Sequence, residues 1–239
     1  MESKTKRLFK LAQKRKQYPV PPSYHAIAYY KKGIYECDHV SPYTKTAGNF
    51  DADVFVMLQD WCSDCYLRGP VCKDSVQYGH SLSCRTNINL KSLLRAHLNL
   101  ELKDTYGTNL FPFIKPGPMN ASIPPRLMKE AAKEFGLPQI DIVSPKLVIC
   151  FGEPTFNAIR RALDIPEVES VAAGLDQPFP YGNSLIWLQY HPADQAQRTR
   201  NKGGIDRVRG DWKKMKDCVR RMAMRRTGTS SRPPNESRH

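Results

Sequence analysis

Four short apolar runs recur along the chain, and each is followed by polar residues or glycine. The runs Val54–Leu58 and Lys146–Gly152 are nearly continuous in apolar residues, which is typical of strands buried on both faces of a parallel sheet. Ser184–Tyr190 repeats this pattern, and Tyr106–Leu110 is a further strand candidate. The pattern predicts four strands.

Segments with helical spacing lie between and after these runs. Pro124–Gly136 has prolines at its start, helix formers inside and glycine as a stop signal. Ser92–Leu100, Pro154–Leu163 and the basic segment Gly203–Met224 are the other predicted helices. Strands that alternate with helices predict an α/β protein, a three-layer α/β/α sandwich with a four-stranded, mainly parallel sheet.

The chain of 239 residues is long enough for one substantial core. Residues 1–24 are basic and hold a proline-rich stretch, so we interpret them as an arm. Residues 25–224 form the predicted domain. Residues 225–239 have little to bury, and we expect them to be a disordered basic tail.

The net charge of the chain indicates which kind of partner it binds. Lys and Arg number 37 against 23 Asp and Glu, a formal charge of +14, which favours a polyanion such as double-stranded or single-stranded DNA. No apolar run approaches the roughly 20 residues that cross a bilayer, and no secretory signal is apparent. We expect a monomer in the cytoplasm, at the nucleoid in a bacterium, without membrane contact.

Polar side chains follow three of the predicted strands. The strings LQDW, TNLFPF and YHP deliver Asp60, Asn109 and His191 to the carboxyl ends of their strands, where open α/β folds build active sites. Alone, Asp60 could be a helix cap, Asn109 a turn residue and His191 a loop histidine. Together they indicate an enzyme that holds a base and activates water.

The order of these strings resembles the uracil-DNA glycosylase superfamily over roughly residues 53–192, including the string SPKLVICFGEPTFNAI. The resemblance implies that Asp60 activates water, Gln59 belongs to the same motif, Asn109 reads the base and His191 stabilises the leaving base. It also implies that the loop from Pro192 approaches DNA. The candidate DNA contacts there are Gln195, Gln197, Arg198 and Arg200, with Arg85 and Lys91 as weaker ones.

The chemistry of base excision suits these residue types. The nucleotide is flipped into a pocket, and the bond from C1′ to the base then breaks with positive charge on the sugar and negative charge on the base. A carboxylate positions water, and a neutral histidine donates to the departing base. No lysine is apparent as a Schiff-base nucleophile, so the expected enzyme is a monofunctional DNA glycosylase that requires no cofactor.

Two departures from the family pattern bear on the substrate. Trp61 and Cys62 stand where the family has Pro-Tyr, and the resemblance implies that this Tyr excludes a C5 substituent. The stacking Phe has no clear counterpart, with Tyr78 and His80 as substitutes. We therefore expect the substrate to be a modified pyrimidine. It would be uracil or, preferably, a C5-substituted or hypermodified base such as those of phage DNA. The biological role would be DNA repair or antiviral defence.

Four clustered cysteines leave alternatives open. They are Cys62, Cys65, Cys72 and Cys84. These residues could bind zinc or an iron–sulfur cluster, although the spacing is not that of two CxxC pairs, and reduced thiols are the simpler interpretation. The competing functions are a non-catalytic nucleic-acid-binding protein of the same fold and a metal-stabilised nucleic-acid-binding module.

Overall fold

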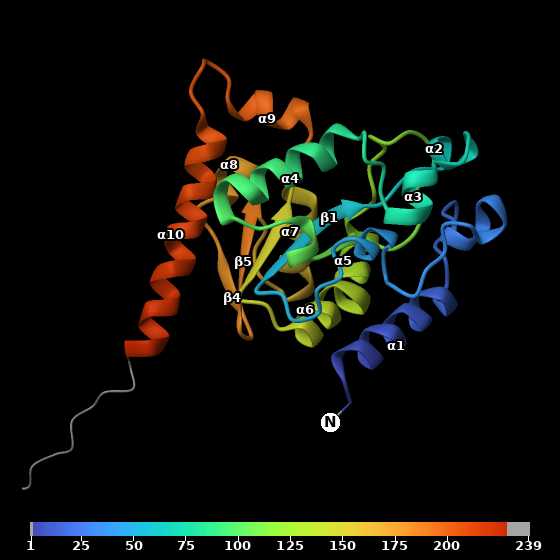
Figure 1. Cartoon of the computed structure of the whole chain (residues 1–239), viewed down its shortest axis with the longest axis horizontal. Coiled ribbons are helices and arrows are strands. Elements are labelled where there is room, and N and C mark those ends of the chain that lie inside the picture. The colour runs from blue at the N-terminus through green and yellow to red at the C-terminus, as the bar shows by residue number, and fades with distance from the viewer. Residues whose placement is uncertain (1, 229–239) are drawn as a thin grey trace, which may run out of the picture.

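A five-stranded sheet forms the centre of the molecule (Figure 1). The computed structural model describes the backbone of residues 2–228 and the side chains of residues 2–221. The strands are β1 (Val54–Asp60), β2 (Tyr106–Phe111), β3 (Leu147–Phe151), β4 (Phe179–Tyr181) and β5 (Ser184–Gln189). Their order is β2-β1-β3-β5-β4, with β4 antiparallel and the other four mutually parallel.

The α/β class and the mainly parallel sheet are thus confirmed, but the predicted number of strands was wrong. The additional strand is β4, which pairs with β5 through a tight turn at Gly182 and Asn183. It has three residues with Pro180 in the middle, and proline is tolerated because β4 lies at the sheet edge. Gly182 has φ of 54°, as a two-residue hairpin turn requires.

The helices among the described residues connect and cover the strands. They are α1 (Lys4–Gln17), α2 (Asp64–Arg68), α3 (Lys73–Tyr78), α4 (Arg85–Leu98), α5 (Pro125–Ala131), α6 (Leu137–Val143), α7 (Glu153–Ala162), α8 (Val171–Gly174), α9 (Asp194–Arg200) and α10 (Arg207–Gly228). The first four residues of the predicted tail therefore lie in α10, and residues 229–239 lie outside the described residues.

Both faces of the sheet are covered by helices, which explains the continuous apolar runs. In β3, Val148 and Cys150 face a core built with α1, α5, α6 and α7, whereas Leu147, Ile149 and Phe151 face a core built with α4 and α10. Because neither face of these strands meets water, no polar alternation appears in their sequence.

Gly136 does not end its helix as predicted. The chain continues through a π-helical segment, Ala132–Gly136, directly into α6. A Cβ atom on Gly136 would lie 2.6 Å from Leu110 Cδ1, so the glycine permits close packing of this segment on β2. The helix was predicted correctly, but Gly136 serves close packing and does not end the helix.

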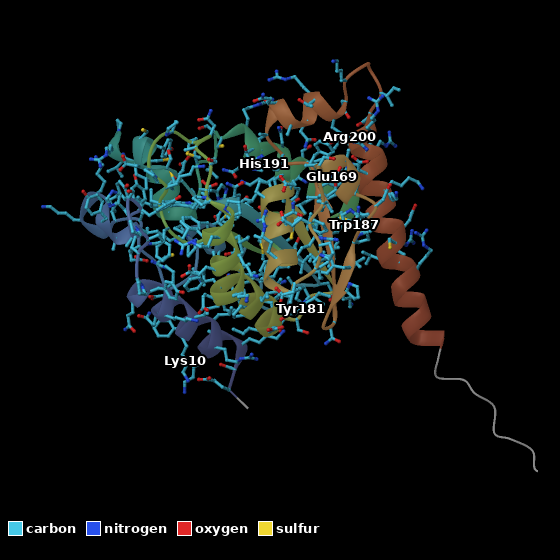
Figure 2. All side chains as sticks on the ribbon, turned by 180° about the vertical axis from the view of Figure 1, so that it is seen from behind. Lys10, Glu169, Tyr181, Trp187, His191 and Arg200 are labelled. Carbon is cyan, nitrogen blue, oxygen red and sulfur yellow. The ribbon has the colours of Figure 1, made fainter. Side chains whose placement is uncertain are left out.

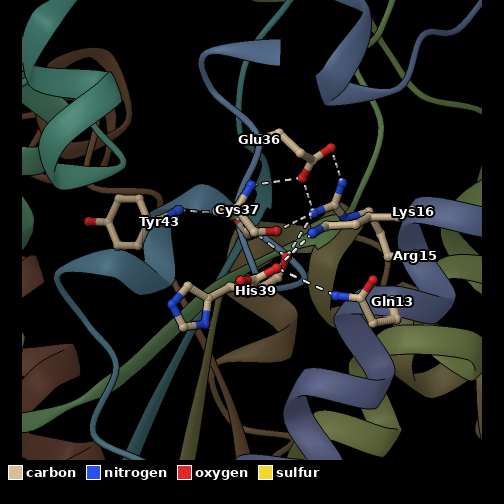
Figure 3. Close-up of polar contacts among 9 residues, drawn as sticks. Gln13, Arg15, Lys16, Glu36, Cys37, His39 and Tyr43 are labelled. Atoms are coloured by element: carbon tan, nitrogen blue, oxygen red, sulfur yellow. Dashed lines mark hydrogen bonds and ion pairs between the residues drawn. The ribbon is translucent and has the colours of Figure 1, made fainter.

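The basic N-terminal segment packs on the domain through α1. Leu8 and Leu11 join the core that α6 also lines. The buried Arg15 guanidinium binds both carboxylate oxygens of Glu36 and the carbonyl oxygens of Cys37 and His39 (Figure 3). These contacts fix α1 to the segment that leads into β1. Among the described residues, no helix is both long and apolar enough to span a bilayer.

Candidate active site

Asp60, Asn109 and His191 lie toward the edge of the sheet that is formed by the carboxyl ends of its parallel strands. Asp60 is the last residue of β1, and Asn109 lies in the neighbouring parallel strand β2, where it pairs with Leu58. His191 follows β5 by two residues, between that strand and α9 (Figure 2). Because β1, β2 and β5 run in the same direction, their carboxyl ends share this edge.

Asp60 is part of a buried ion pair that sequence reasoning missed. Lys115 Nζ lies 2.9 Å from Asp60 Oδ2, with the Asp60 and Lys115 side chains only 8% and 3% exposed. Burial raises the pKa of Asp60 above its usual value, and the ammonium of Lys115 opposes that shift. The available signal was a lysine enclosed in the apolar string FPFIKPG, since a lysine is rarely buried unless paired.

His191 is held as a neutral imidazole with a defined tautomer. Burial, and secondarily the positive charge of Lys115, lowers the pKa of His191 to about 4. Its Nδ1 accepts a hydrogen bond from Ala193 N at 3.2 Å, so the ring proton resides on Nε2. Nε2–H is thus the donor that His191 can offer to another molecule.

Asn109 has a fixed amide orientation. The Ser41 hydroxyl donates to Asn109 Oδ1 at 2.6 Å, and both residues are buried. Ser41 Oγ in turn accepts from Tyr43 N at 3.2 Å. Because Oδ1 already has a donor, the Asn109 NH₂ group is the part that remains to donate to a carbonyl oxygen.

The residues beside Asp60 lie in distinct environments. Gln59 is half-buried. Trp61 is also half-buried, and its Nε1 donates to Gly79 O at 2.7 Å, which anchors the loop after α3. Cys62 is buried in an apolar cluster with Ile27, and burial raises the pKa of its thiol to about 12.

Of the two substitutes for a stacking aromatic, His80 has the more unusual environment. Tyr78 ends α3 half-buried, with its carbonyl oxygen bound by Thr46. His80 is 3% exposed, and burial lowers its pKa to about 4. Within the described part of the chain, neither ring nitrogen of His80 has a hydrogen-bond partner, and nor has the hydroxyl of the adjacent Tyr43.

Tyr24 is an aromatic neighbour of Asp60 that sequence reasoning also missed. Its ring packs edge-on against Phe111, the residue that pairs with Asp60 in the sheet, with 5.2 Å between centroids. Burial, followed by the charge of Asp60, raises the pKa of Tyr24. No local signal marked Tyr24, because Asp60 lies more than thirty positions away from it in the sequence.

The candidate DNA contacts divide into exposed and engaged side chains. Gln195 and Arg198 are exposed on α9. Gln197 donates to the His191 carbonyl oxygen at 2.8 Å, and Arg200 makes two hydrogen bonds of 2.7 Å to Asp211 of α10. Arg85 pairs with Asp194 at 3.3 Å.

A groove of about 410 Å³ separates α4 from α9 and is lined by Arg85, Asn89, Ser92, Leu93, Asp194, Gln197 and Arg198. Lys91 of α4 is half-buried and is not among these lining residues. Arg198 is therefore the exposed predicted contact best placed to reach a phosphate without breaking an existing ion pair.

The four clustered cysteines are not assembled as a metal centre in the part of the chain that the structure describes. No group of three or more His, Cys, Asp or Glu side chains that could hold a metal ion occurs there. Cys62 is buried, whereas Cys65 and Cys84 are exposed, and all are free thiols. The metal-bound alternative stays a prediction.

Neither the protein-family models nor the curated protein sequences contain one that matches this chain.

Proposed function

We propose that this protein is a monofunctional DNA glycosylase, a divergent relative of the uracil-DNA glycosylase superfamily. It would hydrolyse the N-glycosidic bond of a modified pyrimidine and leave an abasic site. The observation that carries this proposal is the neutral His191, with its proton on Nε2, at the same sheet edge as the buried carboxylate of Asp60. One group can donate to a departing base while the other binds water.

In the proposed reaction, the flipped base enters beside Asn109, whose NH₂ group donates to a base carbonyl oxygen. A water molecule that donates a hydrogen bond to the Asp60 carboxylate attacks C1′. At the same time the bond to the base breaks, and the base leaves with the bonding electrons. His191 Nε2–H donates to the oxygen on which negative charge grows. The proton of the attacking water passes to the Asp60 carboxylate and then to solvent.

The proposed substrate is a pyrimidine with a C5 substituent. A small cysteine follows Asp60 by two positions, and its thiol is buried among Ile27, Tyr30 and Leu67. The resemblance to the superfamily implies that an aromatic side chain at that position excludes a C5 substituent, which a cysteine would not do. Such a substrate fits a role in repair or in defence against phages with modified DNA.

The reaction is tested with purified protein and oligonucleotide duplexes and single strands that carry uracil, thymine mismatches or C5-modified cytosines. Excision leaves an abasic site that alkali cleaves. Mass spectrometry of bases released from varied genomic DNA identifies the preferred base. Binding to DNA without release of any base would instead support a non-catalytic nucleic-acid-binding protein.

A further inference from the structure

Lys115 is a buried lysine in direct contact with the carboxylate that the proposed reaction uses. Its Nζ lies 2.9 Å from Asp60 Oδ2, and it also donates to Met119 O at 2.5 Å. Lys115 lies in the connection between β2 and α5, outside the regular elements. Moving an ammonium and a carboxylate out of water is unfavourable unless their attraction and further hydrogen bonds compensate. The buried pair is therefore better explained by a function of the two charges than by stability.

The backbone fixes the position of Lys115 from two sides. His25 and Ile114 exchange backbone hydrogen bonds of 3.1 and 2.9 Å, and Asp64 N donates to Lys115 O at 2.9 Å. Three segments that are distant in the sequence thus meet at Lys115. Its ammonium has little freedom to leave Asp60.

We propose that Lys115 is a positioning residue that orients the Asp60 carboxylate for the hydrolytic water. The inference rests on the proposed glycosylase function. Lys115 occupies Oδ2, so Oδ1 is the oxygen that accepts a hydrogen bond from water. The adjacent ammonium also favours the charged form of a carboxylate that burial would otherwise neutralise.

The contacts of Lys115 argue against a second role as a nucleophile. Attack on C1′ of an abasic site to form an imine requires a neutral amine with a free lone pair. Lys115 Nζ instead donates to a carbonyl oxygen and pairs with a carboxylate, and both contacts would have to break before it could attack. The lysine therefore supports hydrolysis rather than strand cleavage.

The test is a double-mutant cycle on the single-turnover excision rate. Lys115→Met removes the charge and keeps the length of the side chain, and we expect a rate loss of about 10²-fold with little change in DNA affinity. In an Asp60→Asn background the same substitution should cost little, because the carboxylate on which it acts is gone. A purely structural lysine would lower the rate equally in both backgrounds.

The control is Lys146→Met. Lys146 also pairs with an aspartate, Asp53, at 2.7 Å. This pair is exposed, and its two residues directly precede β3 and β1, at the amino ends of these strands and away from Asp60. We expect the native excision rate from this variant. Borohydride reduction with abasic DNA should trap no covalent adduct on the native protein, and an adduct at Lys115 would overturn the proposal.

A second cycle needs no activity. Asp60→Asn and Lys115→Met should each lower the thermal unfolding midpoint, and the double variant should recover part of the loss, since no unpaired charge remains buried. If the native protein excises bases but Lys115→Met keeps the native rate, or if the stability effects simply add, Lys115 has no positioning role. If the stability coupling is present and no substrate is excised, the proposed function fails and the pair is a structural contact.

Discussion

At the scale of single residues, the protonation states of Asp60 and His191 decide what the site can do. The proposed reaction needs a charged Asp60 and a neutral His191. Burial raises the pKa of Asp60 and lowers that of His191 to about 4. The low pKa of His191 keeps this group neutral around pH 7, whereas burial opposes the charged form of Asp60 and Lys115 favours it. Protonation of either group in acid should abolish the reaction.

The first prediction concerns this pH dependence. The single-turnover excision rate should fall in acid as Asp60, whose pKa is raised, and His191 take up protons, and His191 with its pKa of about 4 contributes only to the loss near that pH. Stopped assays across the acid range measure it, with circular dichroism at each pH to verify folding. NMR titration of the His191 ring follows that group alone, and a midpoint at the ordinary histidine pKa of about 6.5 would show that burial does not hold His191 neutral.

Ser41 provides the second prediction. Ser41→Ala removes the donor to Asn109 Oδ1 and should cost about 1 kcal/mol of stability. It should also weaken discrimination between pyrimidines, because the Asn109 amide can then rotate. The measurements are chemical denaturation and relative excision rates on two bases.

Ser184→Ala is the matched control for Ser41→Ala. The Ser184 hydroxyl is also buried and donates to Pro145 O at 2.6 Å, at the opposite edge of the sheet. The control should lose similar stability without any change in base discrimination. Equal discrimination in Ser41→Ala and Ser184→Ala would mean that Ser41 does not orient the base-reading residue.

At the scale of elements, the sequence predicted those segments whose signals are local. The strands β1, β3 and β5 are nearly continuous apolar runs, and Asp60 ends β1 as expected. The expectation that Asn109 ends its strand was wrong, because β2 continues through Leu110 to Phe111. Strand β4 was missed because three residues with a central proline carry almost no strand signal. Lys115 and Tyr24 were missed because their proximity to Asp60 depends on contacts between distant segments, which no periodicity encodes.

The third prediction tests how α1 is held. Arg15→Met leaves the partly buried Glu36 carboxylate without its partner and should destabilise the protein by about 3 kcal/mol. The control is Lys14→Met, which breaks the more exposed pair with Glu134 and should cost less than about 1 kcal/mol. Urea unfolding measures both, and equal effects would mean that Arg15 does not fix α1 to the domain.

At the scale of the whole molecule, the formal charge of +14 predicts that DNA binding depends on salt. Many basic residues are already paired with acidic ones, including Arg85 and Arg200 beside the groove. The count of 37 Lys and Arg residues therefore overstates the number of side chains that are free to contact phosphates. The exposed Arg198 is the clearest predicted contact.

The fourth prediction quantifies that contact. Arg198→Ala should weaken DNA binding and reduce the slope of log affinity against log salt concentration by about 1. Lys146→Ala, at the far edge of the sheet, should leave the slope unchanged. Fluorescence anisotropy over a salt series measures both slopes, and an unaltered slope in Arg198→Ala would remove α9 from the DNA interface.

The central claim is that Asp60 and His191 hydrolyse the bond between a modified pyrimidine and its sugar. The most direct measurement is the release of free base from defined C5-modified DNA by the native protein, by Asp60→Asn and by His191→Gln, each verified as folded. Our account predicts release with an alkali-labile site by the native protein and a loss of at least about 10²-fold in each variant. No release from any substrate, or native rates in both variants, would contradict it.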